Sequence, residues 1–271
     1  MIELLVTVKI GGSTLQSGVF PDLVQDLKEA LTSDKTLLVH GGGREVTDVA
    51  TRLNKQQRFI LSPGGFRSRY TDKETAEIYT MVMSGKINKQ LVLTLQSQGI
   101  PAVGLSGLDG LLIQAERKKK LIIVDESGRK RIIDGGYTGR ISKVNGGLLS
   151  LLLDNGYFPV VAPVAASEEF EPLNVDGDRA AAYVAASVKA DRLVILTDVD
   201  GVILNGKWIP RMTSSEAKDR LHEFGPGMIT KIYAAMEALD MGVDRVIVCS
   251  GLGKHPISSA LKHESGTVIL R

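Results

Sequence analysis

The chain has 271 residues, 43% of them hydrophobic and 24% charged, which is the composition of a globular protein with enough apolar material for a full core. Its 33 Lys and Arg nearly balance 31 Asp and Glu, so a net charge of +2 excludes a general affinity for nucleic acid or membranes and allows only local basic surfaces. The single cysteine, Cys249, excludes a disulfide framework or a zinc cluster. No apolar run approaches the ~18 residues of a membrane-spanning helix, so we expect a cytosolic protein.

The first predicted element is a strand that contains a charge. Residues 4–10 have the pattern of a buried β-strand, yet they include Lys9 and are followed at once by Gly11, Gly12 and Ser13. An unpaired charge in the core costs several kcal/mol. Lys9 must therefore be paired or lie at the end of the strand.

Predicted strands and helices alternate along the rest of the chain. A helix after Pro21 precedes a strand at 36–40, and a long helix is expected over 72–98, where Thr71 and Glu74 fit a capping box. The later predicted elements are strand 101–107, β-hairpin material in 111–117 and 121–134, helix 145–155, strand 158–165, a helix after Asp178, strand 192–199, helix 228–242, strand 244–250 and strand 267–270. This alternation predicts an α/β fold whose mainly parallel sheet is covered by helices on both faces.

Three glycine-rich turns fall where predicted strands end, at 11–13, 41–43 and 105–107. The carboxyl ends of parallel strands meet at one edge of a sheet, and glycine lets backbone N–H groups crowd around an anion there. A fourth segment, GVILNGK, matches the start of a Walker A loop, but Trp208 replaces the required Ser or Thr. We predict a type I′ hairpin turn at Asn205-Gly206 instead.

A series of motifs covers nearly the whole chain in a characteristic order. They are VKIGGS, LVHGGGREV, RYTD, GKINKQLV, GLSGLDG, GYFPVVAPV, LNVDGDRAAA, LTDVDGV and GPGMITK. Together they resemble the amino acid kinase family, and specifically its N-acetylglutamate kinase branch. The resemblance implies a three-layer αβα sandwich with one continuous sheet and a β-hairpin lid. It also implies that residues 1–170 form an N-terminal lobe for the carboxylate substrate and dimerisation, and that residues 171–271 form a C-terminal lobe for ATP, whose Mg²⁺ is held mainly by the phosphates and not by the protein.

The resemblance also implies a role for individual residues. Lys9 and Lys231 would flank the transferring phosphoryl group, and Asp178 would lie between them and orient both. The expected phosphate-binding residues are Gly11, Gly12 and Gly41. The expected substrate-binding residues are Gly42, Gly43, Arg69 and Asn174. The expected nucleotide-binding residues are Thr197, Asp198, Asp200, Gly201 and Met228. The usual GGM…K turn of the family reads GPGMITK here, so the local loop before Lys231 is expected to differ.

The chemistry of such a reaction explains these residue types independently. A carboxylate is already ionised at pH 7, so its phosphorylation needs no general base, and no histidine is required. What two reacting anions need is positive charge: each ammonium ~4 Å from the phosphoryl oxygens contributes ~4 kcal/mol at an effective dielectric constant of about 20. The alternative is that Lys9 and Asp178 form a purely structural pair.

The substrate is expected to be set by GGFRSRYTD, residues 64–72. This version resembles the variant kinases of carrier-protein lysine biosynthesis, in which a small acidic amino-group carrier protein masks the α-amino group of aminoadipate or glutamate. A basic rim on a nearly neutral protein would steer such a partner. The expected carrier contacts are Arg67, Lys118, Lys119, Lys120, Arg129, Lys130 and Arg131, with Lys86 and Lys89 as additions to the same rim. The alternative substrate is free N-acetyl-L-glutamate, in arginine biosynthesis.

Two other classes of function stay open from the sequence. A catalytically silent amino-acid or nucleotide sensor could use the same fold, although Lys9, Asp178 and Lys231 are all present. RNA binding could use the basic runs, but these lack interleaved aromatic residues. We expect no nucleic-acid or membrane partner, and a homodimer joined through the 72–98 helix. The sequence does not separate aminoadipate from glutamate, because one methylene is worth only about 1–3 kcal/mol of discrimination.

Overall fold

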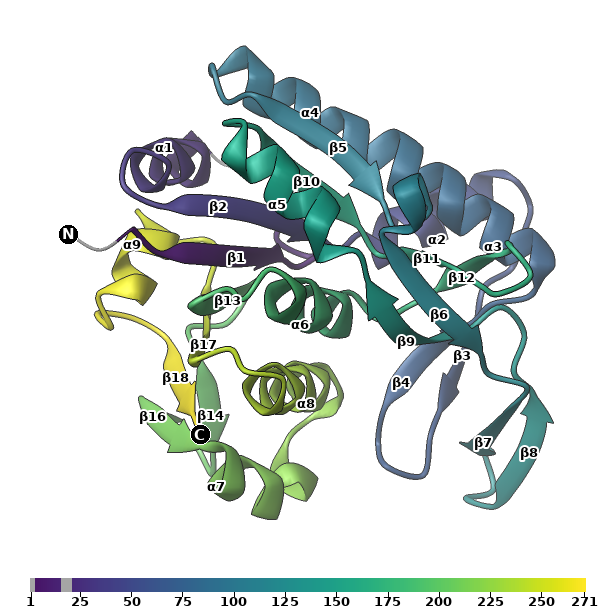
Figure 1. Ribbon diagram of the computed structural model, residues 1–271. Helices are drawn as coiled ribbons and strands as arrows, with labels where there is room; N and C mark the ends of the chain where they lie inside the picture. The colour runs from purple at the N-terminus through teal and green to yellow at the C-terminus, as the bar shows by residue number, and fades with distance from the viewer. Residues whose placement is uncertain (1–2, 16–20) are drawn as a thin grey trace.

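The computed structural model describes residues 3–15 and 21–271, and within them the centre of the molecule is an eight-stranded sheet (Figure 1). In spatial order its strands are β16 (Arg211–Thr213), β18 (Thr267–Leu270), β17 (Arg245–Ser250), β13 (Arg192–Thr197), β1 (Leu5–Ile10), β2 (Lys35–His40), β10 (Phe158–Ala162) and β5 (Ala102–Ser106). Neighbouring strands run parallel except for β17 and β18. Because β1 pairs with β13, the sheet is continuous between the two halves of the chain.

Helices cover both faces of this sheet, and each face has its own apolar core. One face carries α1 (Pro21–Ala30), α2 (Gly43–Arg52), α3 (Lys73–Thr80), the π-helix η1 (Met81–Ile87), α4 (Asn88–Ser97) and α9 (Pro256–Leu261). The other face carries α5 (Gly146–Asp154), α6 (Gly177–Ser187), α7 (Ser214–Asp219) and α8 (Pro226–Asp240). Short 3₁₀ turns lie at η2 (Asp109–Leu111) and η3 (Leu221–Glu223). The predicted αβα sandwich is therefore confirmed.

Smaller sheets complete the fold. One contains β12 (Pro172–Asn174), β11 (Val164–Ala166), β6 (Ile113–Arg117) and β9 (Gly139–Val144). Another, which we call the lid sheet, contains β4 (Arg67–Tyr70), β3 (Arg58–Leu61), β7 (Lys120–Val124) and β8 (Lys130–Asp134). The last is the hairpin β14 (Val202–Leu204) and β15 (Lys207–Ile209).

Both hairpin predictions can be compared with the observed pairings. Asn205 and Gly206 have φ angles of 52° and 73°, as the type I′ turn requires, so that prediction is confirmed. The β7–β8 hairpin also forms across the turn at Ser127 and Gly128. The strand expected within 111–117 is present as β6, which pairs antiparallel with β9 and parallel with β11.

The predicted 72–98 helix is present as the continuous run α3, η1 and α4. Its predicted capping box is wrong, because the N-cap is Asp72, whose carboxylate accepts a hydrogen bond from the Thr75 N–H at 2.8 Å. A carboxylate is a strong cap and its charge is favoured at a helix N-terminus. Thr71 is fully buried and instead accepts a hydrogen bond from the Asn174 side chain at 2.9 Å. Among the described residues, no helix combines the length and apolar character that crossing a bilayer needs.

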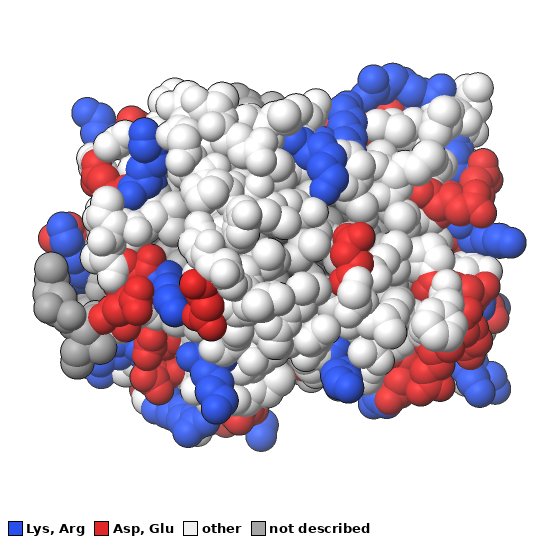
Figure 2. All heavy atoms as spheres, turned by 45° about the horizontal axis from the view of Figure 1, so that its top comes forward, with Lys and Arg blue, Asp and Glu red and all other residues white. Residues whose placement is uncertain are grey.

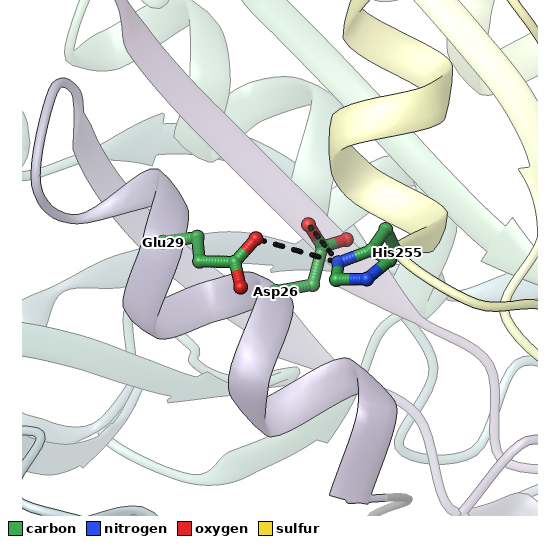
Figure 3. A group of neighbouring side chains, drawn as sticks. All are labelled: Asp26, Glu29 and His255. Carbon is green, nitrogen blue, oxygen red and sulfur yellow. Dashed lines mark ion pairs between the residues drawn. The ribbon is translucent and has the colours of Figure 1, made fainter.

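A cluster of acidic and imidazole groups joins α1 to α9, far from the lid sheet (Figure 3). The buried carboxylate of Asp26 accepts hydrogen bonds from the backbone N–H groups of Ile257 at 2.5 Å and Ser258 at 3.2 Å. His255 lies 3.9 Å from Asp26 and 3.4 Å from Glu29. Since the Asp26 oxygens are already bonded to the first turn of α9, the cluster serves to fix one helix on the other.

Candidate active site

Three charged side chains meet at the end of the central strands. Lys9 lies near the end of β1 and points to the face that α6 and α8 cover. Its Nζ is 2.6 Å from Oδ1 of Asp178, in the first turn of α6. Nζ of Lys231, from α8, is 3.1 Å from the other oxygen, Oδ2. The charge within the first strand is thus both paired and at the strand's end.

Asp178 owes its position to the cap of α6. The Asp176 side chain accepts hydrogen bonds from the N–H groups of Asp178 at 3.0 Å and Arg179 at 2.9 Å, so α6 begins directly under the end of β1. Burial would raise the pKa of Asp178, but the charges of Lys9 and Lys231 outweigh it and bring that pKa to about 2. Asp178 is therefore an anion at neutral pH and holds two ammonium groups around one point.

Burial acts on Lys9 in the opposite sense. It lowers the pKa of Lys9, against the attraction of Asp178, and the nearby charge of Lys231 lowers this pKa further. An anion that enters beside Lys9 and Lys231 would restore the balance, because an opposite charge favours the protonated amine. The site is therefore suited to receive an oxyanion.

Two glycine turns lie in backbone contact beside these charges. A Cβ atom on Gly12 would lie only 2.8 Å from the Gly42 nitrogen, and one on Gly41 would lie 2.8 Å from the Gly12 nitrogen. Real Cβ atoms do not approach so closely, so neither position admits a side chain. The contact gathers peptide groups from the ends of β1 and β2 next to Lys9, where their N–H groups can serve an anion.

A cavity of about 580 Å³ opens from these groups and extends under the lid sheet. The predicted site residues that line it are Lys9, Gly12, Gly41, Gly42, Gly43, Arg67, Arg69, Lys118, Asn174 and Asp178. Phe59, Phe66, Ile122 and Tyr233 give it apolar walls. Gly11 and Lys231 do not line it: Gly11 is buried, and Lys231 pairs with Asp178, which does line it. A volume of this size suits a small organic acid with part of a larger attachment.

Arg69 is fixed in the cavity wall. Its guanidinium donates hydrogen bonds to the Gly43 carbonyl at 2.6 Å and to the Thr47 hydroxyl at 2.9 Å, and it also contacts Gln57. It stacks 4.9 Å from the ring centre of Phe59. Arg69 thus links the lid sheet to the glycine turn as well as bringing a charge to the cavity.

The predicted nucleotide residues lie outside the lining of this cavity, four of them at the end of β13 and in the loop that follows it, and Met228 on α8. Thr197 ends β13, and its hydroxyl donates to the Asp198 carboxylate at 3.1 Å. Asp200 and Gly201 follow in the same loop, and Met228 lies half-buried in the first turn of α8. Burial raises the pKa of Asp198, but hydrogen bonds to its own backbone, Thr197 and Ser13, with the charge of Lys231, lower it overall. Lys231 therefore acts electrostatically on both regions.

The predicted basic rim divides into two parts. Lys118 lies partly buried in the cavity, where burial and the charges of Arg179 and Arg140 lower its pKa. The other members lie just before β7, on β7 and β8 and in the turn between them, and they are exposed: Lys119, Lys120, Arg129, Lys130 and Arg131. Lys86 and Lys89 lie on η1 and α4, outside the lid sheet, where Lys86 pairs with Glu45 and Lys89 donates to Asn88 and to the Gly104 carbonyl. Their contribution to the basic rim stays a prediction.

The sequence reasoning did not single out several residues of the cavity. Arg179 forms two hydrogen bonds with Glu237, at 2.7 and 2.5 Å, and lies 5.5 Å from the ring centre of Tyr233. Tyr79 donates to the Pro163 carbonyl at 3.1 Å. Asp176 could have been recognised as an N-cap, since it precedes Gly177 and a run of alanines. The Arg179–Glu237 pair joins two helices distant in the sequence and carries no local signal.

Comparison with known sequences gives one consistent result. The amino acid kinase family model matches residues 5–250. A LysW-aminoadipate/LysW-glutamate kinase from Saccharolobus islandicus is 45% identical over 267 residues, covering 98% of this chain and 99% of that protein. A protein from Nitrosopumilus maritimus, provisionally given the same name, is 53% identical over 265 residues, with coverage of 98% and 99%.

Solved structures share the fold at low sequence identity. N-acetylglutamate synthase from Neisseria gonorrhoeae, in complex with coenzyme A and N-acetyl-glutamate, has a TM-score of 0.81 at 23% identity and covers 99% of this chain, which spans 59% of that chain. Carbamate kinase from Giardia lamblia bound to AMP-PNP has a TM-score of 0.64 at 15% identity, with coverage of 99% and 98%. From the match over residues 5–250 and the full-length relatives, the chain belongs to the amino acid kinase family.

Proposed function

We propose that the protein is an ATP-dependent kinase that phosphorylates the side-chain carboxylate of 2-aminoadipate, glutamate or both, while the amino group of the acceptor is linked to a small acidic carrier protein. The product is an acyl phosphate. The observation that carries the proposal is the cavity itself, which joins a reaction centre of two lysines and one aspartate to a basic lid sheet. The names of the full-length relatives support the same substrate class.

The residues of the reaction centre would act by charge and position. Lys9 and Lys231 would lie on either side of the transferring phosphoryl group and neutralise its oxygens, and Asp178 would keep the two ammonium groups in place before the reaction. The N–H groups of the glycine turns would supply further donors. The acceptor carboxylate needs no base, which agrees with the lack of a histidine in the cavity lining within the described residues.

The same residues fit a nucleotide triphosphate with its metal. Both carboxylate oxygens of Asp178 are taken by lysines, so in the described reaction centre Mg²⁺ would be held mainly by phosphate oxygens. The metal would add positive charge there. We propose that the C-terminal lobe, residues 171–271, binds the nucleotide through Thr197, Asp198, Asp200, Gly201 and Met228. The N-terminal lobe, residues 1–170, would bind the acceptor through Gly42, Gly43 and Arg69, with Asn174 at the boundary.

The lid sheet would receive the carrier protein. Ile122 on β7 pairs with Ile132 on β8, and both are exposed, at 54% and 67%. Lys120 and Lys130 lie two residues from them along their strands. An exposed apolar pair between ammonium groups suits a small acidic protein, with charge steering its approach and the apolar pair holding it. Such a kinase would serve lysine biosynthesis in the cytoplasm, and arginine biosynthesis where glutamate is the acceptor.

We also propose a homodimer joined through the α3–η1–α4 run. Figure 2 shows the side of the molecule on which α4 and β5 lie, and its centre carries few charged side chains. Leu93 on α4 is 66% exposed and Met81 on η1 is 57% exposed. Exposed apolar side chains on a face poor in charge favour a contact between copies. Sedimentation of the wild type and of Leu93→Glu tests this, and a wild-type monomer would contradict it.

Trapping the acyl phosphate with hydroxylamine tests the function. The enzyme is given ATP, Mg²⁺ and one of three acceptors: carrier-linked aminoadipate, carrier-linked glutamate or free N-acetylglutamate. We expect hydroxamate from at least one carrier-linked acceptor, at a rate that falls steeply with added salt, because exposed charges are screened. Hydroxamate from free N-acetylglutamate alone would instead support an acetylglutamate kinase.

A further inference from the structure

The side chain of His40 lies behind the glycine turn, on the face of the sheet opposite to Lys9. His40 ends β2 and pairs in register with Ile10, whereas Lys9 pairs with Val39. Successive strand side chains alternate between faces, so His40 points with Ile10 into the core under α2 and η1. It is fully buried, at 0% exposure. It therefore cannot touch a ligand beside Lys9.

The hydrogen bonds of His40 define its protonation. Nδ1 lies 3.0 Å from the Gly41 carbonyl oxygen, and Nε2 lies 3.3 Å from the side-chain nitrogen of Asn88. A carbonyl oxygen only accepts and an amide nitrogen only donates, so the ring is neutral and carries its proton on Nδ1. The Asn88 orientation is itself set by its other partners. Its nitrogen donates to the Val160 carbonyl at 2.9 Å, and its oxygen accepts from Lys89 at 3.0 Å.

Asn88 in turn connects the ends of neighbouring central strands. It is fully buried at the point where η1 becomes α4, and its amide nitrogen reaches β10 through Val160 and β5 through Leu105, at 3.3 Å. Through His40 it also reaches β2. A π-helical segment such as η1 often lies at a functional site. Here η1 brings its side chains directly against the turn, because a Cβ on Gly42 would collide with Ile87.

The hydrogen bond from His40 to the Gly41 carbonyl sets the direction of the next N–H group, that of Gly42. A peptide unit is planar and trans, so the C=O of Gly41 and the N–H of Gly42 point in opposite directions. Fixing that carbonyl on the imidazole behind the sheet turns the Gly42 N–H towards the cavity, which Gly42 lines. Among the described residues, this N–H donates to no protein acceptor.

We propose that His40 and Asn88 are positioning residues for phosphoryl transfer, which hold the Gly41–Gly42 peptide so that its N–H serves as a fixed donor to the anion in the cavity. The inference rests on the proposed role of the glycine turns in binding phosphate or carboxylate oxygens. A donor that is already aimed at the developing charge lowers the barrier, whereas a peptide free to rotate must be ordered during the reaction.

Three variants separate positioning from mere packing. His40→Asn keeps an N–H donor near the position of Nδ1, and His40→Leu removes it. Leu38→Ala is the matched control, since Leu38 is buried on the same strand and the same face, two residues away. The measurements are kcat and KM by hydroxamate trapping, thermal unfolding, and the NMR shift of the Gly42 amide when AMP-PNP with Mg²⁺ is added.

We expect His40→Leu to lower kcat about 30-fold with little change in KM, and to lose the Gly42 amide shift. His40→Asn should stay within about fivefold of wild-type kcat, and Leu38→Ala should lose stability but keep kcat within about twofold. Wild-type kcat in His40→Leu, or an equal loss of kcat in Leu38→Ala, would overturn the proposal. If the wild type is inactive on carrier-linked acceptors, only the proposed substrate is overturned. The variants are then compared by their kcat on free N-acetylglutamate and by the shift of the Gly42 amide.

Discussion

The reaction centre and the lid sheet are built on opposite physical principles. Lys9 and Asp178 are each only 5% exposed, lie on the central sheet and its covering helix, and are paired before any ligand arrives. The lid sheet presents exposed groups instead, among them Ile132 at 67%, and it is a separate sheet to one side of the central sheet (Figure 1). The charges of the reaction centre are buried and fixed, whereas those of the lid sheet are exposed to solvent.

This difference separates the chemistry from the choice of acceptor. Fixed buried charges act strongly on a transition state, because little reorganisation is needed and screening is weak. Exposed charges act mainly on the rate of encounter with a charged partner. Changes at the reaction centre should therefore lower kcat for every acceptor, and changes on the lid sheet should alter kcat/KM for a carrier-linked acceptor only.

The largest effect is expected at Lys9. Lys9→Met should lower kcat by about 10²–10³, because a preorganised charge at the phosphoryl oxygens is lost. It should also lower the free energy of unfolding, because the buried Asp178 loses one of its two partners. The double variant Lys9→Met/Asp178→Asn removes both charges. It should recover only part of the stability measured by urea unfolding, because Lys231 then loses its carboxylate partner, and it should show no recovery of kcat.

The single variant Lys9→Met also tests the alternative that the pair is only structural. If Lys9 and Asp178 served stability alone, the single variant would keep its turnover once corrected for the folded fraction. A normal kcat in Lys9→Met, measured on protein shown to be folded, would contradict the catalytic assignment.

The sequence predicted the elements of this centre better than their contacts. Glycine turns at the ends of predicted strands located the edge of the sheet where Lys9 lies, because strand periodicity and turn chemistry are local signals. The pairing of Lys9 with Asp178 followed only from the family resemblance, since the two residues are far apart in the chain. Arg179 lies within the recognised motif LNVDGDRAAA, but its partner Glu237 lies in none of the motifs and 58 residues further along the chain, so the pair was missed.

The wrong helix cap and the strand pairing that was not predicted have the same origin. Residues 111–117 and 121–134 carry hairpin signals, but these signals do not say that β6 pairs with β9 and β11, which lie beyond the lid hairpin. Thr71 and Glu74 have the spacing of a capping box, yet the Thr71 hydroxyl accepts a hydrogen bond from Asn174, and Asp72 is the N-cap instead. Tertiary contacts decided both cases, and a sequence pattern does not contain them.

The second prediction concerns the effect of pH on the free energy of unfolding through the buried residue His40. Burial lowers the pKa of His40 to about 4. Repulsion from Lys9 and Lys89 also lowers this pKa, whereas the hydrogen bond to Gly41 raises it. The folded state therefore binds fewer protons than the unfolded state between pH 4 and the ordinary histidine pKa of about 6.5, so stability falls as pH decreases through this window. The expected loss is about 3 kcal/mol by pH 4.

Urea unfolding at several pH values measures this loss, and His40→Asn is the control because it lacks the titrating group. Its stability should change less between pH 6.5 and 4. Asp178 contributes little in this window, because its pKa is lowered from 3.8 to about 2 and most of its own loss of stability therefore falls below pH 4. Parallel curves for the variant and the wild type would show that His40 does not stay neutral in the folded protein.

On the lid sheet, reversing two exposed charges should act on the encounter with the carrier. Lys120→Glu/Lys130→Glu is expected to lower kcat/KM for a carrier-linked acceptor about 10-fold at low salt, with the difference shrinking as salt is added. Turnover of free N-acetylglutamate, if present, should not change. Lys28→Glu/Lys262→Glu makes the same change of charge on the exposed surface of α1 and just after α9, and it should leave kcat/KM close to that of the wild type. An equal effect from both pairs would mean that net charge, and not the lid sheet, guides the carrier.

The smallest effect is expected from the apolar pair between those lysines. Ile132→Ser should change the free energy of unfolding by less than about 0.5 kcal/mol, because the side chain is already mostly in water. If the carrier covers Ile132 and Ile122, the same change should raise KM for the carrier-linked acceptor about fivefold, which corresponds to about 1 kcal/mol of lost apolar contact. The comparison variant is Leu61→Ser, on the neighbouring lid strand β3, where the wild-type leucine is 41% exposed. An unchanged KM in Ile132→Ser would place the carrier elsewhere on the lid sheet, and it would leave charge as the main contribution of β7 and β8.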